Sequence, residues 1–426
     1  MTERPVENLE GALNRALERH AAKAPAPASD LFERVETRYR RRRRVRTTGA
    51  AAAMALVLSG TAFGMWSHDG GSAVLLESPS PGAQPLSRPG QKAESPFRAT
   101  PVEKLWPEAV HRIPARLRDG TEIMPQTLID ERTVLVNSWG GFEKPSVLYA
   151  YDLPTGEATR ITDVVTPKNT QIFASGFTVG EGRIFWHTTS TDLTSTIWSV
   201  PVKGGTAVVT VERTPAAAPF EGGAMTAGQI PGGQIGDLTV SGGKLYWSRS
   251  GGGVYTAPVA GGPAEPVPGT EEEMLVQWPW VGGLASDSRQ DRGRINGRDL
   301  RNLETGEKKT AAFSPGEENW DCGITWCLAG SLVKDRSGTE TFRVSGHPAV
   351  APNQTASLDR FVASVSRSDQ KTLLLLNDLR TRRSGSIELV QKDDEVSYST
   401  MKSSGSRMYS TRLADEYVIV DLKAIG

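Results

Sequence analysis

Apolar and polar positions follow different patterns in four consecutive stretches of the chain. Over residues 5–21 apolar residues recur at steps of three and four, which predicts an amphipathic helix. A second helix is predicted from Asp30, because Glu33 three residues later completes a capping pair. We therefore expect residues 1–46 to form a short helical tail.

The second stretch, residues 47–66, has no charged residue. Its 20 residues span about 30 Å as a helix, which matches the hydrocarbon thickness of a bilayer. Seven arginines between Arg38 and Arg46 precede it, and positive charge stays on the cytoplasmic side. We predict one transmembrane helix with the amino terminus inside. A signal peptide cut near Gly64 is the alternative, although its 46-residue amino-terminal region is longer than usual.

The third stretch, residues 67–104, has six prolines among Ser, Gly and Gln and little periodicity. Such a composition is typical of a linker that has no packed core of its own. We expect it to hold the carboxy-terminal region clear of the membrane.

The fourth stretch, residues 105–426, has short β-type runs divided by Gly, and a loose repeat. The repeated element is a strand that ends in an Asp-Leu-x-Thr-Gly or Gly-Gly type of turn. Its copies start at Leu148, Ile197, Val254, Arg298, Leu332, Leu373 and Tyr417. A second element precedes two copies, at residues 182–186 and 243–247. Repeats near 45 residues with several short strands each are typical of propeller blades.

We predict an all-β propeller with seven blades, because 322 residues (105–426) give 46 residues per blade. Six blades is the alternative, since the fifth unit is short. The last copy, residues 417–422, leaves only four residues before the end of the sequence. We expect residues 110–117 to supply the missing outer strand, which would close the ring and remove an exposed edge.

Composition and charge narrow the function. Hydrophobic residues make up 38% and glycines number 44, which excludes wholesale disorder. The 49 basic and 49 acidic residues cancel, which argues against a protein that mainly neutralises nucleic-acid phosphates. Topology and anionic headgroups account for the arginine run. We expect a lipid bilayer but no nucleic acid among the partners.

Enzyme motifs are missing from the sequence. It has no Gly-x-Ser-x-Gly, so a serine hydrolase of that type has no anchor. The histidines of the carboxy-terminal region, His111, His187 and His347, are more than seventy residues apart, which does not match zinc-ligand spacing. We predict no catalytic, cofactor-binding or metal-binding residue, and a protein that is not an enzyme.

Two of the ten tryptophans, Trp278 and Trp280, flank a proline. Aromatic residues commonly pack between blades. The proline indicates a loop or edge, however, and we identify these two as the candidate binding surface.

Cys322 and Cys327 are the only cysteines. An even cysteine number in an exported domain predicts a disulfide. An extended chain would separate their Cα atoms by roughly 16 Å, whereas a disulfide needs about 7 Å or less. We therefore predict a tight turn, permitted by Gly323, and a local disulfide at the start of the fifth blade, with two buried thiols as the alternative.

The strand-and-turn copies resemble bacterial extracytoplasmic propellers of the TolB-type or WD-repeat-like class, over about three quarters of the chain. The resemblance implies a fold and little about function. We expect a single-pass protein of the cell membrane whose outward propeller binds a protein or cell-envelope component and has a possible sensory role.

Two alternatives remain. The arrangement of tail, single span and outer domain is similar to membrane-bound anti-sigma factors, in which residues 1–46 would bind a cytoplasmic regulatory protein. The tail has only His20 and no cysteine, so it lacks the zinc-type motif of many such proteins. The other alternative is an envelope lyase or a peptidase-associated propeller.

Overall fold

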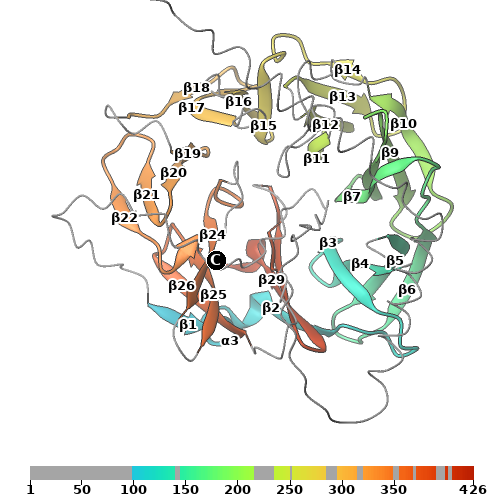
Figure 1. Cartoon of the computed structure of the whole chain (residues 1–426), viewed down its shortest axis with the longest axis horizontal. Coiled ribbons are helices and arrows are strands. Elements are labelled where there is room, and N and C mark those ends of the chain that lie inside the picture. Colours follow the sequence, from blue (N-terminus) through green and yellow to red (C-terminus); the bar gives the residue numbers. More distant parts are fainter. Residues whose placement is uncertain are drawn as a thin grey trace, which may run out of the picture. The chain divides into compact units, whose positions relative to one another are not determined.

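The computed structural model describes residues 98–139, 144–214, 235–249, 252–284, 295–313, 320–348, 355–367, 371–389, 399–401 and 405–426. They form seven sheets in a ring (Figure 1). The seven-bladed propeller is confirmed, and six blades is wrong. The predicted tail and membrane segment lie outside these residues. Within the described ranges, no helix has the length and apolar character needed to cross a membrane.

We number the blades by the chain order of their inner strands. Blade 1 contains β3 (Ile123–Leu128), β4 (Thr133–Trp139), β5 (Pro145–Asp152) and β6 (Ala158–Asp163). Blade 2 contains β7 (Thr170–Gly180), β8 (Arg183–Ser190), β9 (Ser195–Pro201) and β10 (Val208–Thr214). Blade 3 contains β11 (Ile235–Ser241), β12 (Lys244–Arg249), β13 (Val254–Pro258) and β14 (Glu265–Pro266). In each, the strands pair in chain order from inside to outside.

Blades 4 to 6 continue the pattern. Blade 4 contains β15 (Glu273–Gln277), β16 (Trp280–Leu284), β17 (Ile295–Asn302) and β18 (Lys308–Thr310). Blade 5 contains β19 (Asp321–Cys322), β20 (Trp326–Ala329), β21 (Leu332–Asp335) and β22 (Thr341–Arg343). Blade 6 contains β23 (His347–Pro348), β24 (Phe361–Arg367), β25 (Thr372–Asp378) and β26 (Arg383–Leu389).

Blade 7 joins the two ends of the described region. It contains β27 (Ser399–Met401), β28 (Met408–Leu413) and β29 (Glu416–Asp421), followed by the turn η2 (Leu422–Ala424). Its fourth strand is β2 (Val110–Pro114), which pairs antiparallel with β29. This confirms the predicted closure of the ring by the segment that begins at Val110.

The folded region begins before the expected end of the linker at residue 104. β1 (Ala99–Pro101) pairs parallel with β26 as a fifth strand of blade 6. The helix α3 (Val102–Leu105) and the turn η1 (Pro107–Ala109) lead from there to β2. Val102 is fully buried in an apolar cluster, so burial as well as pairing fixes this segment.

The seven predicted repeats are the third strands of the seven blades, from β5 to β29. In every blade the first residue after this strand donates its backbone N–H to the carbonyl of the residue just before the second strand, as Leu153 does to Arg132 at 2.9 Å. That donor is Leu or Val in six blades and Arg336 in blade 5. The sequence repeat therefore marks a recurrent hydrogen-bonded corner. We call the Leu or Val that donates this bond in six blades the apolar anchor of its blade.

The core lies between neighbouring blades. Leu148 of blade 1 packs in one cluster with Trp186 of blade 2, and Phe185 of blade 2 packs in the next with Trp247 of blade 3. Adjacent residues of one strand thus serve opposite faces, as the two-residue period of a β-strand requires. This explains the paired aromatic residues of the second repeated element.

The Gly-Gly turns also connect blades. Gly204 and Gly205 of blade 2 both have positive φ, and the N–H of Gly205 donates to Ile161 O in blade 1 at 3.1 Å. A Cβ on Gly204 would lie 3.2 Å from Ile161 O. Glycine is needed here both for the backbone conformation and for the close approach.

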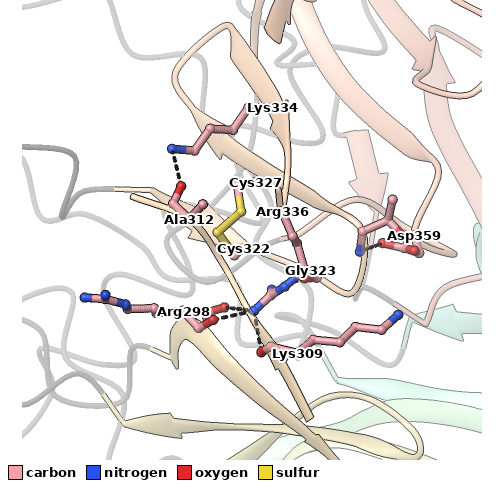
Figure 2. Close-up of a disulfide and its surroundings, with 11 residues drawn as sticks. Arg298, Lys309, Ala312, Cys322, Gly323, Cys327, Lys334, Arg336 and Asp359 are labelled. Atoms are coloured by element: carbon pink, nitrogen blue, oxygen red, sulfur yellow. Dashed lines mark hydrogen bonds between the residues drawn. A yellow bond between two sulfur atoms is a disulfide. The ribbon is translucent and has the colours of Figure 1, made fainter. Parts of the chain in front are cut away.

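The two cysteines form a disulfide across the β19–β20 hairpin, with Cα atoms 3.9 Å apart (Figure 2). Both are buried. The chain does turn between them, and the N–H of Gly323 donates to Trp326 O at 2.7 Å. Gly323 does not have a positive φ, however. A glycine suits the site because a Cβ would lie 3.0 Å from Cβ of Thr355.

Candidate functional site

A cavity of about 480 Å³ lies at the carboxyl-terminal ends of the inner strands β3, β7, β11 and β15. The segment before β28 and the turn η2 also line it. Inner strands pair with one neighbour only, so their other edge faces the middle of the ring. With Leu358 of blade 6, every blade except blade 5 thus contributes a described residue to one site.

Three threonines occupy equivalent positions in this wall. Thr127 pairs with Leu135, Thr178 with Phe185, and Thr239 with Tyr246. These three positions are equivalent because each partner lies three residues after the residue just before the second strand, whose carbonyl accepts the corner hydrogen bond described above. All three threonines are half-buried and line the cavity, and their hydroxyls bond no other described residue. Repetition of the blade therefore repeats a hydroxyl around the wall.

The two predicted binding tryptophans separate. Trp278 lines the cavity, half-buried, and stacks on Tyr246 of blade 3 with ring centroids 3.5 Å apart. Its indole N–H donates to Glu304 at 3.2 Å. Trp280 is only 7% exposed and packs inside blade 4 with Val276 and Leu300. Trp278 lies in the turn between β15 and β16, whereas Trp280 is the first residue of β16, and of the two only Trp278 lines the cavity. A binding surface formed by both tryptophans stays a prediction.

Two cations contribute to the cavity lining. Nε of Arg407 donates to Oδ1 of Asp421 at 2.9 Å, and Nη2 bonds the other carboxylate oxygen. Asp421 also accepts the backbone N–H of Lys423 at 3.0 Å. Hydrogen bonding to Asp421 is the main reason that the pKa of Arg407 is raised. The Arg407 charge is thus largely balanced, and Lys423 carries the second positive charge.

The three histidines lie in different blades, His111 on β2, His187 on β8 and His347 on β23. His187 is fully buried, and neither ring nitrogen has a partner. Burial lowers its pKa to about 4, so it is neutral at physiological pH. Burial also lowers the pKa of His111. The fold does not bring these residues together.

The cavity wall that the structure describes contains no carboxylate and no imidazole. Across the described ranges, no three His, Cys, Asp or Glu side chains are grouped so that they could hold a metal ion. The arrangement can form hydrogen bonds and aromatic contacts with a ligand.

Outside the cavity, a buried arginine lies between blades 4 and 5. The Arg336 guanidinium donates to the carbonyls of Gly323 at 2.6 Å and of Gly297 at 2.9 Å, and to those of Arg298 and Lys309 (Figure 2). Burial lowers its pKa to about 10, which leaves it charged at neutral pH. Its partners are all main-chain oxygens, so this site is structural.

Comparison with known proteins shows no family for this chain. No family model and no curated protein matches the chain. A solved oligogalacturonate lyase from Vibrio parahaemolyticus is 10% identical, with 73% of this chain and 90% of that chain covered and a TM-score of 0.41.

Two other similar structures are as distant. The putative TolB from Agrobacterium tumefaciens is 11% identical over 73% of this chain and 97% of that chain, with a TM-score of 0.30. BamB from Moraxella catarrhalis is 10% identical over 71% of this chain and 86% of that chain, with a TM-score of 0.34. These likenesses concern the propeller fold, which the strand pairing already establishes.

Sequence reasoning missed the threonines and Gln277, although part of the signal was present. The segments Phe-Thr-Val-Gly-Glu-Gly-Arg-Ile-Phe-Trp, residues 177–186, and Leu-Thr-Val-Ser-Gly-Gly-Lys-Leu-Tyr-Trp, residues 238–247, match position by position. Extending the second repeated element by five residues would have found Thr178 and Thr239. No such repeat precedes Gln277.

Proposed function

We propose that this protein is a single-pass membrane protein whose outward propeller binds a protein or cell-envelope component in its central cavity. The arginines before residue 47 support the orientation. The described wall of the cavity can form hydrogen bonds and has no carboxylate or imidazole, which supports binding rather than catalysis. The propeller is then a recognition module held outside the membrane.

The unused polar groups of the cavity carry this proposal. Gln277 and Ser241 line the wall beside the three threonines, and their side chains bond no other described residue. These side chains are half-buried, and each of them can still donate and accept hydrogen bonds. A wall with several free hydroxyls and an amide is therefore complementary to a ligand that supplies their partners.

Site-specific photo-crosslinking in intact cells tests this proposal. A benzoylphenylalanine at Gln277 should form an adduct on illumination. The same probe at Val208, which is 48% exposed on the outer strand β10, is the matched control and should form none. Equal adducts at both positions, or none at either, would reject the cavity as the binding site.

The topology requires a separate test. Protease added to intact cells should digest or release the propeller while a tag on residue 2 stays protected. Protection of the propeller would overturn the orientation and would leave the cavity proposal standing.

A regulatory function is the second candidate, because the tail has two predicted amphipathic helices that 46 residues cannot bury well on their own. In this version residues 1–46 bind a transcription factor of the sigma class. Pull-down with the tail should capture that factor, and tail variants with the apolar stripe replaced by serine should not. An empty result with the native tail favours simple anchoring.

A further inference from the structure

The cavity wall has a chemistry that favours one kind of ligand. The hydroxyls of Thr127, Thr178 and Thr239 can each donate and accept a hydrogen bond, and Gln277 adds an amide with both capacities. None of these groups has a hydrogen-bond partner among the described residues. The matching ligand presents several groups that also donate and accept.

Trp278 adds a flat apolar surface to this polar wall. Its ring is held by the stack on Tyr246 and by the hydrogen bond to Glu304. Both constraints come from neighbouring parts of the fold, so the indole is fixed in place before a ligand arrives. Such a ring can pack against the C–H face of a ligand while the hydroxyls bond its edges.

The charges argue against a strongly ionic ligand. Asp421 holds Arg407 through two nitrogens, and among the lining residues that the structure describes only Lys423 carries an unbalanced charge. Glu131 and Asp130 lie close enough to contribute to the raised pKa of Arg407. Charges of both signs therefore act around Arg407, and neither sign dominates there.

We propose that the cavity binds a short, uncharged saccharide segment. Sugar hydroxyls donate and accept as the threonines do, and the C–H face of a pyranose ring packs on Trp278. A volume of about 480 Å³ falls within the range of about 300–1,000 Å³ for small-ligand sites. This inference rests on the proposed function and names the ligand class of the same cavity.

Calorimetric titration of the full chain in detergent with maltotriose, mannotriose and triacetylchitotriose tests the inference. At least one should bind with saturation. Trp278→Ala should weaken that binding about tenfold, and Thr239→Val, which removes a hydroxyl at nearly constant volume, about threefold. Both estimates correspond to the loss of one aromatic contact or one hydrogen bond.

Thr310→Val is the matched control, because Thr310 lies on the outer strand β18 and bonds Asp299 away from the cavity. It should leave the affinity unchanged. The Thr239→Val variant keeps the test valid if Trp278→Ala destabilises the fold. The thermal midpoint of Thr239→Val should stay close to that of the native chain.

Two outcomes would overturn the saccharide inference. One is failure of all three trisaccharides to bind, and the other is equal binding by the Thr239→Val and Thr310→Val variants. If acetyl-Ser-Thr-Ser-amide binds instead, or if the adduct at Gln277 is a protein, the site is a peptide site. In that case the proposed function holds and only the ligand class is wrong.

Discussion

Two interfaces between blades are held together in different ways. On the closure side of the ring, which comprises blades 6, 7 and 1, neighbouring blades share large apolar clusters. There β1 adds to blade 6 and β2 completes blade 7, so strands from the two ends of the described chain pair with each other. Between blades 4 and 5 the apolar clusters are small. There the buried Arg336 of blade 5 donates to main-chain oxygens of blade 4, next to a disulfide that lies within blade 5. An interface that lacks apolar volume can therefore be held by charged hydrogen bonds to main-chain oxygens.

The closure side also has buried ion pairs at equivalent places. An arginine just before the second strand pairs with the aspartate that ends the third strand, as Arg360 does with Asp378 and Arg407 with Asp421. Arg360 additionally donates to Ile425 O at 2.8 Å and to Gly426 O at 2.7 Å. It therefore ties the end of the chain to blade 6.

The blade 4–5 interface depends on close backbone approach. A Cβ on Gly297 would lie 2.2 Å from Cys322 O, so the backbones of β17 and β19 are in contact there. Arg336 takes the position of the apolar anchor and extends to Gly297 O in blade 4. Blade 5 is the unit with the shortest sequence repeat, and its strands of two to four residues offer little apolar surface.

The largest expected effect is at Arg360. Arg360→Ala leaves Asp378, whose side chain is 0% exposed, without its partner, and should lower the free energy of unfolding by about 3–5 kcal/mol. The control is Arg132→Ala, since Arg132 is 61% exposed in the equivalent pair of blade 1 and should cost less than about 1 kcal/mol. Equal losses of unfolding free energy in urea for the two variants would show that burial does not determine how much this ion pair contributes to stability.

The same pair predicts a pH dependence. Burial raises the pKa of Asp378, but the hydrogen bonds from Arg360 and Thr381 outweigh this effect, so the pKa lies below the ordinary value of 3.8 for an aspartate. A lowered pKa stabilises the folded state above pH 3.8, and this stabilisation is lost as pH falls further. The difference between native chain and Arg360→Ala should therefore shrink in acid. A constant difference down to pH 3 would contradict this assignment.

Ring closure by β2 predicts the next effect. Ile113 is 1% exposed and packs with Tyr417 and Ile123, which belong to blades 7 and 1. Ile113→Ala should cost about 2–4 kcal/mol in urea unfolding, and Ile113→Val about 1 kcal/mol, because the cost follows the cavity left behind. A loss below 1 kcal/mol for the alanine variant would mean that β2 does not close the ring in solution.

Arg336 distinguishes the other interface. Arg336→Ala should cost about 2–3 kcal/mol, because main-chain oxygens lose charged donors in a buried place. Arg336→Leu restores the apolar anchor of the other six blades and should cost less. If leucine is as damaging as alanine in urea unfolding, apolar packing cannot replace the hydrogen bonds there.

The disulfide should have the smallest effect. It closes a short loop, so replacing both cysteines by alanine should cost about 2 kcal/mol or less in the chain-entropy account. Thiol labelling of the denatured, unreduced protein should find no reactive thiol, because both cysteines are bonded. Two labelled thiols per chain would show that the bridge does not form.

Local repetition made the propeller predictable from sequence. Strand periodicity, Gly-containing turns and a spacing near 45 residues depend on neighbours in the chain, and each predicted copy is a third strand of the structure. The closing strand was predictable as well, because the last repeat lacked an outer partner. Of the site, the sequence indicated Trp278, since a following proline interrupts the strand pattern.

The sequence by itself thus determined the blades, their number and their closure, because β-pairing and turn formation are encoded in short segments. Tertiary structure alone decided which residues meet at the centre. The cavity combines Thr127, Thr178, Thr239 and Gln277 with Lys423, which lie up to 296 residues apart (423 − 127). It also decided that Trp278 lines the cavity while Trp280 is buried, because the chain turns between β15 and β16 and carries only Trp278 in that turn.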